Sequence, residues 1–349
     1  MENHALQPWM ASVEPYLAPL AEVARSFTDL SAVPVDLPSA LFLRARLAGL
    51  ERPGRTSANG SCHLLHAADG WAAVNLARPD DLAAVPTLLA LLGSPNEPDG
   101  PDGPDGLRTA ARRVAAAEVA EAAQLLGIAA AVPGSAQDAR PAVQASRWGE
   151  RRIRKMAGTR IVDFSALWAG PLCARLLGVA GARVTKVESV TRPDGARFGN
   201  PAFYRWLHDG HDNLVVDFAP GALDEIVAEA DVVIEASRPR ALRRLGLRAE
   251  EFLAARPGRV WVSITGYGRE SDRIAFGDDA AVAGGLTGVD RNGAPVFLGD
   301  ALADPVTGVF AAHAVARSLA EGGGVLLSVS MAACAATLAR AGTRVHPPC

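Results

Sequence analysis

From residue 158 onward, short apolar runs alternate with helix-like segments, and this alternation constrains the fold more than any other feature of the chain. The runs are 160–164, 182–188, 213–218, 231–236 and 259–268. Strands that alternate with helices predict a mostly parallel sheet covered on both faces, an α/β fold of Rossmann-like type. Sheets of this kind bind ligands beyond the carboxyl ends of their strands. Functional residues are therefore expected in the turns after Phe164, Glu188, Ala236 and Thr265.

The part of the chain before residue 158 has a different texture. Residues 1–50 are typical of Ala/Leu-rich helices punctuated by prolines, and 62–76 holds two apolar runs around an Asp-Gly pair, a strong hairpin signal. The Pro-Asp-Gly repeat at 95–106 predicts a surface loop without helix or strand. A single helix ended by glycine is expected over 107–127, and the polar, Arg-rich residues 134–157 predict a linker.

The composition bounds the functional classes. The 349 residues exceed what one hydrophobic core usually organises, so two domains are expected. A net charge of −3 gives no support for a nucleic-acid binder, and no stretch approaches the roughly 20 apolar residues that span a bilayer. The N-terminus lacks a basic region followed by an apolar one, so no secretory signal is predicted. Four widely spaced cysteines favour neither a disulfide framework nor a zinc site, which indicates a cytoplasmic protein.

Three patterns give weak functional signals. The first strand–helix turn carries Gly170 and the second strand ends at Glu188, but without G-x-G-x-x-G a nicotinamide enzyme is disfavoured. His208 and His211, flanked by aspartates, lack a third ligand, so a solvated turn is favoured over a metal site. The arginines after the fourth strand fit an anionic ligand or a solvated helix face about equally well. They are Arg238, Arg240, Arg243 and Arg244.

Asp304-Pro305 precedes an Ala-rich segment in the pattern of a helix N-terminus, with the acid as N-cap and the proline as first helical residue. An aspartate there faces free backbone N–H groups and the positive end of the helix dipole, and both favour its carboxylate form. From position alone, a plain N-cap is the favoured interpretation and catalysis the alternative.

Six sequence blocks between residues 158 and 340 carry a family resemblance. They are RIVDFSALWAGPLCARLLGVAGARVTKVE, DVVIEASRPRALRRLGL, VWVSITGYG, FGDDAAVAGGLTG, ALADPVTGVFAAHAVARSL and GGGVLLSVSMAACAATLA. In this order they resemble the large domain of the family III CoA-transferases, a group that includes formyl-CoA and carnitine CoA-transferases and α-methylacyl-CoA racemase. The resemblance places Asp304 on the family's nucleophilic aspartate and implies CoA transfer between carboxylic acids through an aspartyl-CoA thioester.

The resemblance also implies ligands and partners. Coenzyme A or acyl-CoA is expected as substrate and a carboxylic acid as acceptor, with no metal and no tightly bound cofactor. A homodimer is expected, and neither a membrane nor a nucleic acid is expected as a partner. Gly284-Gly285 is expected to lend backbone N–H groups to a developing oxyanion.

Several positions depart from the family pattern. Ser189 stands where an arginine often follows the second strand, Ala236-Ser237 replaces an Asn-Phe pair, and the lysine usual after the third strand is missing near Phe218. Racemases carry histidine where this chain has Asp278, so racemisation would need Asp278 and Asp304 as two carboxylate bases. The residues expected to bind CoA are Trp168, Ala169, Gly170, Arg197, Phe218, Ala236, Ser237, Arg238, Arg244, Leu245, Phe276 and Asp278.

The order of domains is unusual, because the family places its small domain after the large one. Here two segments that resemble small-domain sequence, 67–89 and 120–134, come first. Circular permutation or tandem duplication would give this order. The expected division is an N-terminal helical segment (1–56), a small α+β domain (57–140), a linker (141–157) and a large Rossmann-like CoA-transferase domain (158–349). Besides CoA transfer, two functions stay open: α-proton chemistry on an acyl-CoA, and a non-catalytic relative that binds an acyl-CoA or a partner chain.

Overall fold

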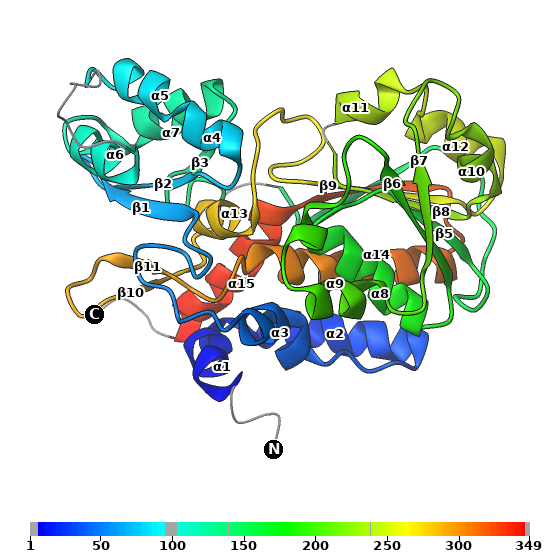
Figure 1. The fold of residues 1–349 in the computed structure, drawn as a ribbon. Helices are drawn as coiled ribbons and strands as arrows, with labels where there is room; N and C mark the ends of the chain where they lie inside the picture. Colours follow the sequence, from blue (N-terminus) through cyan, green and yellow to red (C-terminus); the bar gives the residue numbers. More distant parts are fainter. Residues whose placement is uncertain (1–5, 95–102, 138–139, 238, 346–349) are drawn as a thin grey trace.

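The computed structural model describes residues 6–94, 103–137, 140–237 and 239–345. Its main sheet has the strand order β4-β12-β9-β8-β5-β6-β7, and Figure 1 labels strands β5 to β9 of this sheet. The strands from β12 to β7 run parallel, and β4 pairs antiparallel with β12. Their bounds are Val143–Arg147 (β4), Arg160–Asp163 (β5), Arg183–Ser189 (β6), Asp212–Val216 (β7), Val232–Glu235 (β8), Val260–Thr265 (β9) and Val325–Ser330 (β12). The Rossmann-like α/β fold and the five predicted strands are confirmed.

Alternating apolar side chains explain why this sheet is covered on both faces. On β8, Val232 and Ile234 join the core under α8 and α14, whereas Val233 joins the core under α10 and α12. The helices are Ala169–Val179 (α8), Asp224–Glu229 (α10), Pro239–Arg244 (α11), Ala249–Ala255 (α12) and Ala303–Ala320 (α14). The edge strand β7 is an exception, because most of its residues are exposed.

The N-terminal helices pack against the same core as the main sheet. They are Gln7–Val13 (α1), Glu14–Tyr16 (η2), Ala18–Ser31 (α2) and Leu37–Ala48 (α3), as the sequence predicted. Leu20 and Phe27 of α2 are fully buried in the core that also contains α14 and α15, Met331–Val345. Figure 1 shows α2 and α3 beneath α8, α9 and α14.

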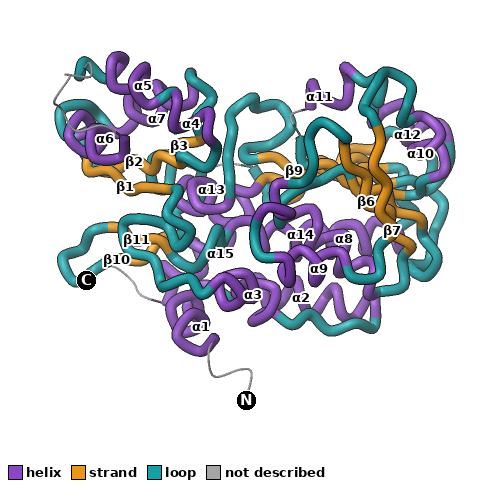
Figure 2. Tube along the Cα trace, viewed as in Figure 1, coloured by secondary structure: helices purple, strands orange, loops and turns teal. Residues whose placement is uncertain are grey.

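A second, smaller sheet is built from residues 62–131. Its strands are Cys62–His66 (β1), Trp71–Asn75 (β2) and Ala129–Ala131 (β3), all antiparallel, so the predicted hairpin is confirmed. The helices against it are Pro79–Ala83 (α4), Val85–Leu91 (α5), Gly103–Ala111 (α6) and Ala116–Leu125 (α7). Helices α5, α6 and α7 share a hydrophobic core with the sheet, and this core is separate from the main core. Figure 2 shows these strands as a group apart from the main sheet.

Two expectations for this region are corrected. The single helix over 107–127 is wrong, because Ala115 is extended and the carboxylate of Asp69, in the hairpin turn, accepts the Ala116 N–H at 2.7 Å and begins a new helix there. The loop predicted over 95–106 lies partly outside the described residues, and its described part, 103–106, is the first turn of α6.

The region expected to be a linker also contains regular structure. Residues 143–147 form the edge strand β4, although they are polar and mostly exposed, because their backbone pairs with β12. The remaining elements are Gly195–Phe198 (η3), Pro201–His208 (α9), Gly277–Ala283 (α13), Thr287–Val289 (β10) and Pro295–Phe297 (β11). Within the described residues, none of the helices combines the length and apolar character needed to cross a membrane.

Candidate active site

The strand order reverses between β5 and β8, because the chain proceeds outward from β5 to β7 and then returns to the other side of β5. Ligand sites in open α/β sheets lie at such a switch point. The turn after β5 is tightly fixed. Leu167 has a positive φ of 71° and donates its N–H to the Asp194 carboxylate at 2.9 Å. A Cβ on Gly170 would collide with the Ser165 side chain, so only glycine fits there.

Asp304 does not cap helix α14. Leu302 already has helical angles and is the N-cap, which makes Asp304 the second helical residue and Pro305 the third. The helix begins early because Ala301, with φ of 45°, turns the chain and accepts the Asp304 N–H at 2.9 Å. The prediction that Asp304 is an N-cap followed by proline at the first helical position is therefore wrong.

The expected preference of Asp304 for the carboxylate form is also corrected. Burial of this carboxyl raises its pKa to about 7. The Arg44 charge and a hydrogen bond from the Gly277 backbone oppose that rise, while Asp279 and Asp300 add to it. Gly277 begins α13, and a Cβ on it would lie 2.5 Å from the Asp304 Oδ2. The starts of α13 and α14 therefore touch at the proposed nucleophile.

Two further acids come from the first turn of α13. Asp278 is buried and accepts the Ala301 N–H at 3.0 Å, and burial raises its pKa to about 8. Asp279 is fully buried and accepts the Asn75 side-chain amide at 2.9 Å and the Phe276 N–H at 3.0 Å. Burial raises the pKa of Asp279 to about 7. Asn75 ends strand β2, so the small sheet contributes directly to this site.

A fourth acid, Asp300, lies in the loop before α14 and is fully buried. Arg44 of α3 is its ion-pair partner, at 3.2 Å, and burial raises the pKa of Asp300. The Arg44 guanidinium also lies over the Trp168 ring, 5.4 Å from the centroid. We call Asp278, Asp279, Asp300 and Asp304 the acidic cluster.

The structure brings some predicted site residues together and separates others. Asp278 and Asp304 belong to the acidic cluster, and the N–H of Phe276 donates to Asp279 of the cluster. The Trp168 ring lies beside the Arg44 guanidinium, which faces the cluster. Ala169 is buried behind Trp168 in α8. Phe218 packs edge-on against Phe164 at the end of β5, with ring centroids 6.0 Å apart, instead of standing at the cluster.

The predicted residues after β8 line the neighbouring edge of the sheet. Ala236 is exposed, and the Ser237 hydroxyl donates to Glu235 at 2.9 Å. Arg244 is exposed at the end of α11, whereas Leu245 packs on the core under α10 to α12. Arg238 lies outside the described residues.

The Arg197 guanidinium is paired with the Glu188 carboxylate. Its guanidinium donates to both oxygens of Glu188, at 2.6 and 2.9 Å, and lies 4.4 Å from the centroid of the Tyr204 ring. Although burial opposes it, this pairing and the N–H of Asp194 lower the pKa of Glu188 to about 2. Arg197 therefore holds the turn after β6.

The expected oxyanion donors are engaged elsewhere. The N–H groups of Gly284 and Gly285 donate to Ala280 and Val282 at the C-terminal end of α13, opposite the end that touches Asp304. A Cβ on Gly284 would lie 2.6 Å from a backbone oxygen of α15, so this glycine serves helix packing. The expectation for this glycine pair is not met.

The histidines predicted to lie in a solvated turn are instead packed inside. His208 is buried, and its ring lies 4.4 Å from Tyr204 and 5.7 Å from His211. Burial lowers the pKa of His208 to about 3 and that of His211 to about 4. Among the residues that the structure describes, no three His, Cys, Asp or Glu side chains are placed so that together they could hold a metal ion.

Sequence reasoning missed Arg44, Asn75, Asp279 and Asp300. The doubled acid in F-G-D-D was a usable signal for Asp279, because it stands directly beside Asp278, a residue already expected to bind CoA. Arg44 and Asn75 had no local signal, because each lies more than 200 positions before the acid that it contacts.

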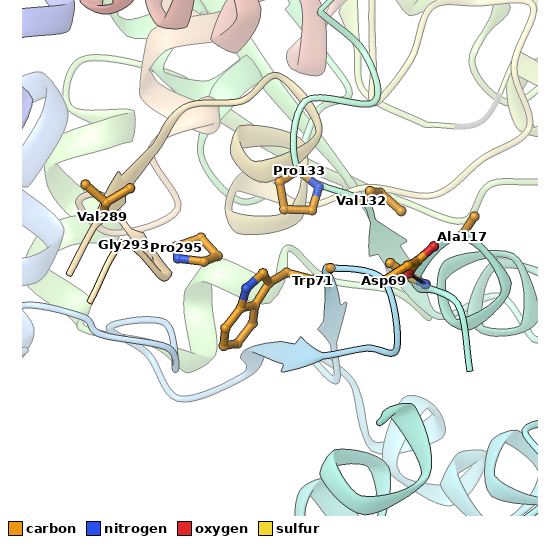
Figure 3. A pocket seen from close by; sticks show the side chains of 10 residues that line it. Asp69, Trp71, Ala117, Val132, Pro133, Val289, Gly293 and Pro295 are labelled. Carbon is orange, nitrogen blue, oxygen red and sulfur yellow. Dashed lines mark hydrogen bonds between the residues drawn. The ribbon is translucent and has the colours of Figure 1, made fainter. Parts of the chain in front are cut away.

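A pocket of about 420 Å³ lies away from the acidic cluster (Figure 3). The Trp71 indole lies across its middle, between Asp69, Ala117 and Val132 on one side and Gly293 and Pro295 of the β10–β11 hairpin on the other. The Trp71 side chain also packs on a small core that contains Cys62 and Phe297.

The fold and the site define an α/β protein with buried carboxyls gathered beyond its parallel sheet. The family described as CoA-transferase family III matches residues 156–344, and the chain belongs to this family. It is 31% identical over 188 residues to an acyl-CoA transferase of Fusarium pseudograminearum, covering 47% of this chain and 41% of that protein. It is 34% identical over 182 residues to the succinyl-CoA–L-malate CoA-transferase beta subunit of Chloroflexus aurantiacus, covering 47% and 45%.

A solved structure gives a similar result. The crystal structure of a hypothetical protein from Mycobacterium tuberculosis matches with a TM-score of 0.50 and 27% identity, over 57% of this chain and 60% of that chain. In each of these comparisons the match covers less than two thirds of the relative's length.

Proposed function

We propose that this protein is an acyl-CoA transferase that moves CoA between carboxylic acids, with Asp304 as nucleophile. The observation that carries the proposal is the placement of a half-buried carboxyl where α13 and α14 touch, in a chain that belongs to CoA-transferase family III. A pKa of about 7 leaves roughly half of the Asp304 carboxyls ionised at neutral pH, which is enough for a nucleophile.

The proposed reaction uses one carboxylate twice. An Asp304 oxygen attacks the thioester carbonyl of the donor, the C–S bond breaks, and a mixed anhydride and CoA thiolate result. The thiolate then attacks the Asp304 carboxyl carbon, which releases the donor acid and leaves an aspartyl-CoA thioester. The acceptor carboxylate attacks this thioester and releases the thiolate, which takes the acceptor acyl group and regenerates the Asp304 carboxylate. Each step exchanges one bond for another of similar kind, so no oxidant or reductant is required.

We propose that CoA binds along the carboxyl ends of β5 and β8. The turn beginning at Trp168 and the exposed Ala236 offer backbone at the switch point, and the exposed Arg244 offers a charge for a phosphate. Arg197 acts through Glu188 instead, because its guanidinium is already paired. Loss of CoA affinity in Arg244→Ala, measured by calorimetry, would support this path, and unchanged affinity would contradict it.

Racemisation of an acyl-CoA is the second candidate. Ala301 joins the two acids, because its N–H donates to the Asp278 carboxylate at 3.0 Å and its carbonyl accepts the Asp304 N–H at 2.9 Å. Their pKa values of about 8 and 7 suit proton transfer near neutral pH. In deuterated water, solvent deuterium at the α-carbon without CoA exchange would favour this chemistry.

The test of the proposed function is a search for the covalent intermediate. The protein is incubated with a panel of acyl-CoAs, quenched with hydroxylamine or borohydride, and digested for mass spectrometry. A mass change on the peptide that contains Asp304 is expected, and Asp304→Asn should abolish it. Asp217→Asn, at an exposed position, is the matched control. The absence of any adduct in the wild-type protein, together with measurable CoA binding, would contradict the transferase mechanism.

We also propose the domain division stated above, with residues 57–140 as a small domain and a homodimer as the working form. The separate core around Leu65, Leu88 and Val119 supports the small domain. The strand β4 shifts the start of the large domain toward residue 143. Light scattering at several protein concentrations tests the dimer, and a constant monomer mass would contradict it.

A further inference from the structure

The Arg44 guanidinium lies beside the acidic cluster at the candidate site. Arg44 lies 3.2 Å from the Asp300 carboxylate, which is fully buried, while a quarter of the Arg44 side chain remains exposed. Neither Asp300 oxygen has a hydrogen bond that meets ordinary geometry within the described part of the chain, so the Arg44 charge is its principal partner. The acidic cluster therefore contains more buried acid than its hydrogen bonds alone satisfy.

The helix that carries Arg44 is held firmly against the loop that begins α14. Asp36 caps the start of α3 by accepting the Ser39 N–H at 3.2 Å. At the end of α3, the Leu47 carbonyl accepts a hydrogen bond from the side-chain amide of Asn200, the N-cap residue of α9, at 2.7 Å. A Cβ on Gly299 would lie 3.2 Å from the fully buried Phe42 ring, so α3 and the loop leave no spare room between them. The position of Arg44 is therefore set by packing.

We propose that Arg44 is a positioning residue for Asp304: its ion pair with Asp300 fixes the loop that starts α14, and its charge offsets the crowded carboxyls so that Asp304 can act as a nucleophile. This inference rests on the proposed function only in taking Asp304 as the reacting group. The loop in question, 299–302, contains the strained Ala301, whose N–H donates to Asp278. Strain at such a residue persists only where neighbouring contacts hold it.

The electrostatic part of the proposal has a definite sign. Arg44 lowers the pKa of Asp278, Asp300 and Asp304, against the effect of burial in each case. Two further arginines lie beside residues that border the cluster: Arg78, 5.7 Å from the Phe276 ring centroid and paired with Asp81, and Arg273, 5.0 Å from the Tyr267 ring centroid. Cys62 of β1 and Tyr267 after β9 have pKa values raised chiefly by burial, so both are neutral near pH 7. Removing the Arg44 charge should therefore raise the pKa of Asp304, and removing the Asp300 charge should lower it.

The experiment compares Arg44→Met, Arg44→Lys and Asp300→Asn in the full chain. Proteins labelled with ¹³C at the aspartate carboxyl carbon are titrated by NMR, and the Asp304 signal is assigned with Asp304→Asn. We expect the pKa of Asp304 to rise in Arg44→Met and to fall in Asp300→Asn. In Arg44→Lys, which keeps the positive charge, the pKa of Asp304 should stay near the wild-type value. Opposite shifts from the two partners of one ion pair would not follow from general loosening of the structure.

The activity measurement gives the corresponding kinetic result. If Arg44→Met raises the pKa by one unit from about 7, the CoA exchange rate at pH 7 falls roughly fivefold and recovers near pH 9. Unchanged Asp304 titration in both Arg44→Met and Asp300→Asn would overturn the inference. If Arg44→Met fails to fold, Asp300→Asn still decides the sign, because a pKa of Asp304 that does not fall in this variant would overturn the inference. Shifted titration in a protein that exchanges no CoA would overturn the proposed function and leave the role of Arg44 intact.

Discussion

Asp278 should make the protein less stable as the pH rises. Its pKa is about 8 in the folded chain, against an ordinary value of 3.8, because it is buried. Below pH 3.8 both states hold the proton and this effect vanishes. Between 3.8 and about 8 the unfolded chain releases the proton and the folded chain keeps it, so the free energy of unfolding falls with pH. One such group costs about 1.4 kcal/mol per pH unit.

Asp278→Asn removes this dependence while keeping the carbonyl oxygen that accepts the Ala301 N–H. At pH 7 the cost that it removes has an upper limit of roughly 4 kcal/mol, from the interval between 3.8 and 7. The neighbouring carboxyls titrate together with it, so the measured gain should be smaller than this limit.

Urea unfolding at half-unit steps from pH 5 to 8.5 measures the effect. The variant should lose less free energy of unfolding than the wild type as the pH rises, and this difference in slope is the result that matters. Asp217→Asn, at an exposed site, should leave the slope unchanged. Parallel curves for Asp278→Asn and the wild type would refute the reasoning, whatever their vertical offset.

Three further predictions follow from the packing of the site. Gly277→Ala should lower the CoA exchange rate at least about tenfold, because its Cβ would lie 2.5 Å from the Oδ2 of Asp304, the proposed nucleophile. The same variant should unfold at lower urea, because the Cβ would also lie 2.3 Å from the Ala301 backbone oxygen; Gly54→Ala, with no atom within 4 Å, should match the wild type in both assays. Asn75→Ala should lower the urea-unfolding free energy by about 1–3 kcal/mol, since it leaves a buried carboxyl without its amide partner; an unchanged value would contradict this. Lys186→Met should lower the urea-unfolding free energy by about 3–5 kcal/mol, because Asp194, 3.0 Å away and fully buried, would lose its counter-charge. A urea midpoint equal to that of the wild type would contradict this prediction.

The strands of the main sheet could be predicted because their signal is local. The centre of a run such as 231–236, Val232 to Ile234, is apolar on both sides, as a strand buried on two faces requires, and the spacing of the runs leaves room for a covering helix. The edge strand β4 could not be predicted because it lacks such a local signal. Its side chains face solvent, so its sequence is polar, and only pairing with β12 makes it a strand.

The candidate site was predictable only in part. Asp304 could be singled out from its motif, but its protonation could not, because the pKa depends on burial and on acids brought by other elements. The expected carboxylate preference failed because burial outweighs the helix dipole at Asp304. The N-cap prediction failed because Ala301 turns the chain early, and a positive φ at alanine leaves no sequence signal. Arg44 and Asn75 contact the acidic cluster only after three distant segments have packed together.

The contact between Arg44 and Asp300 affects the order in which the parts of the candidate site form during folding. The ion pair joins Arg44 and Asp300, 256 positions apart, and the family match at 156–344 contains the four acids but neither Arg44 nor Asn75. During synthesis, α2 and α3 emerge well before α14, and their apolar faces stay uncovered until α14 is made. Contacts at such separation form late and slowly. A nascent or truncated chain can therefore build most of the sheet while its acids still lack a counter-charge, so reactivity at Asp304 would report that the whole chain has folded.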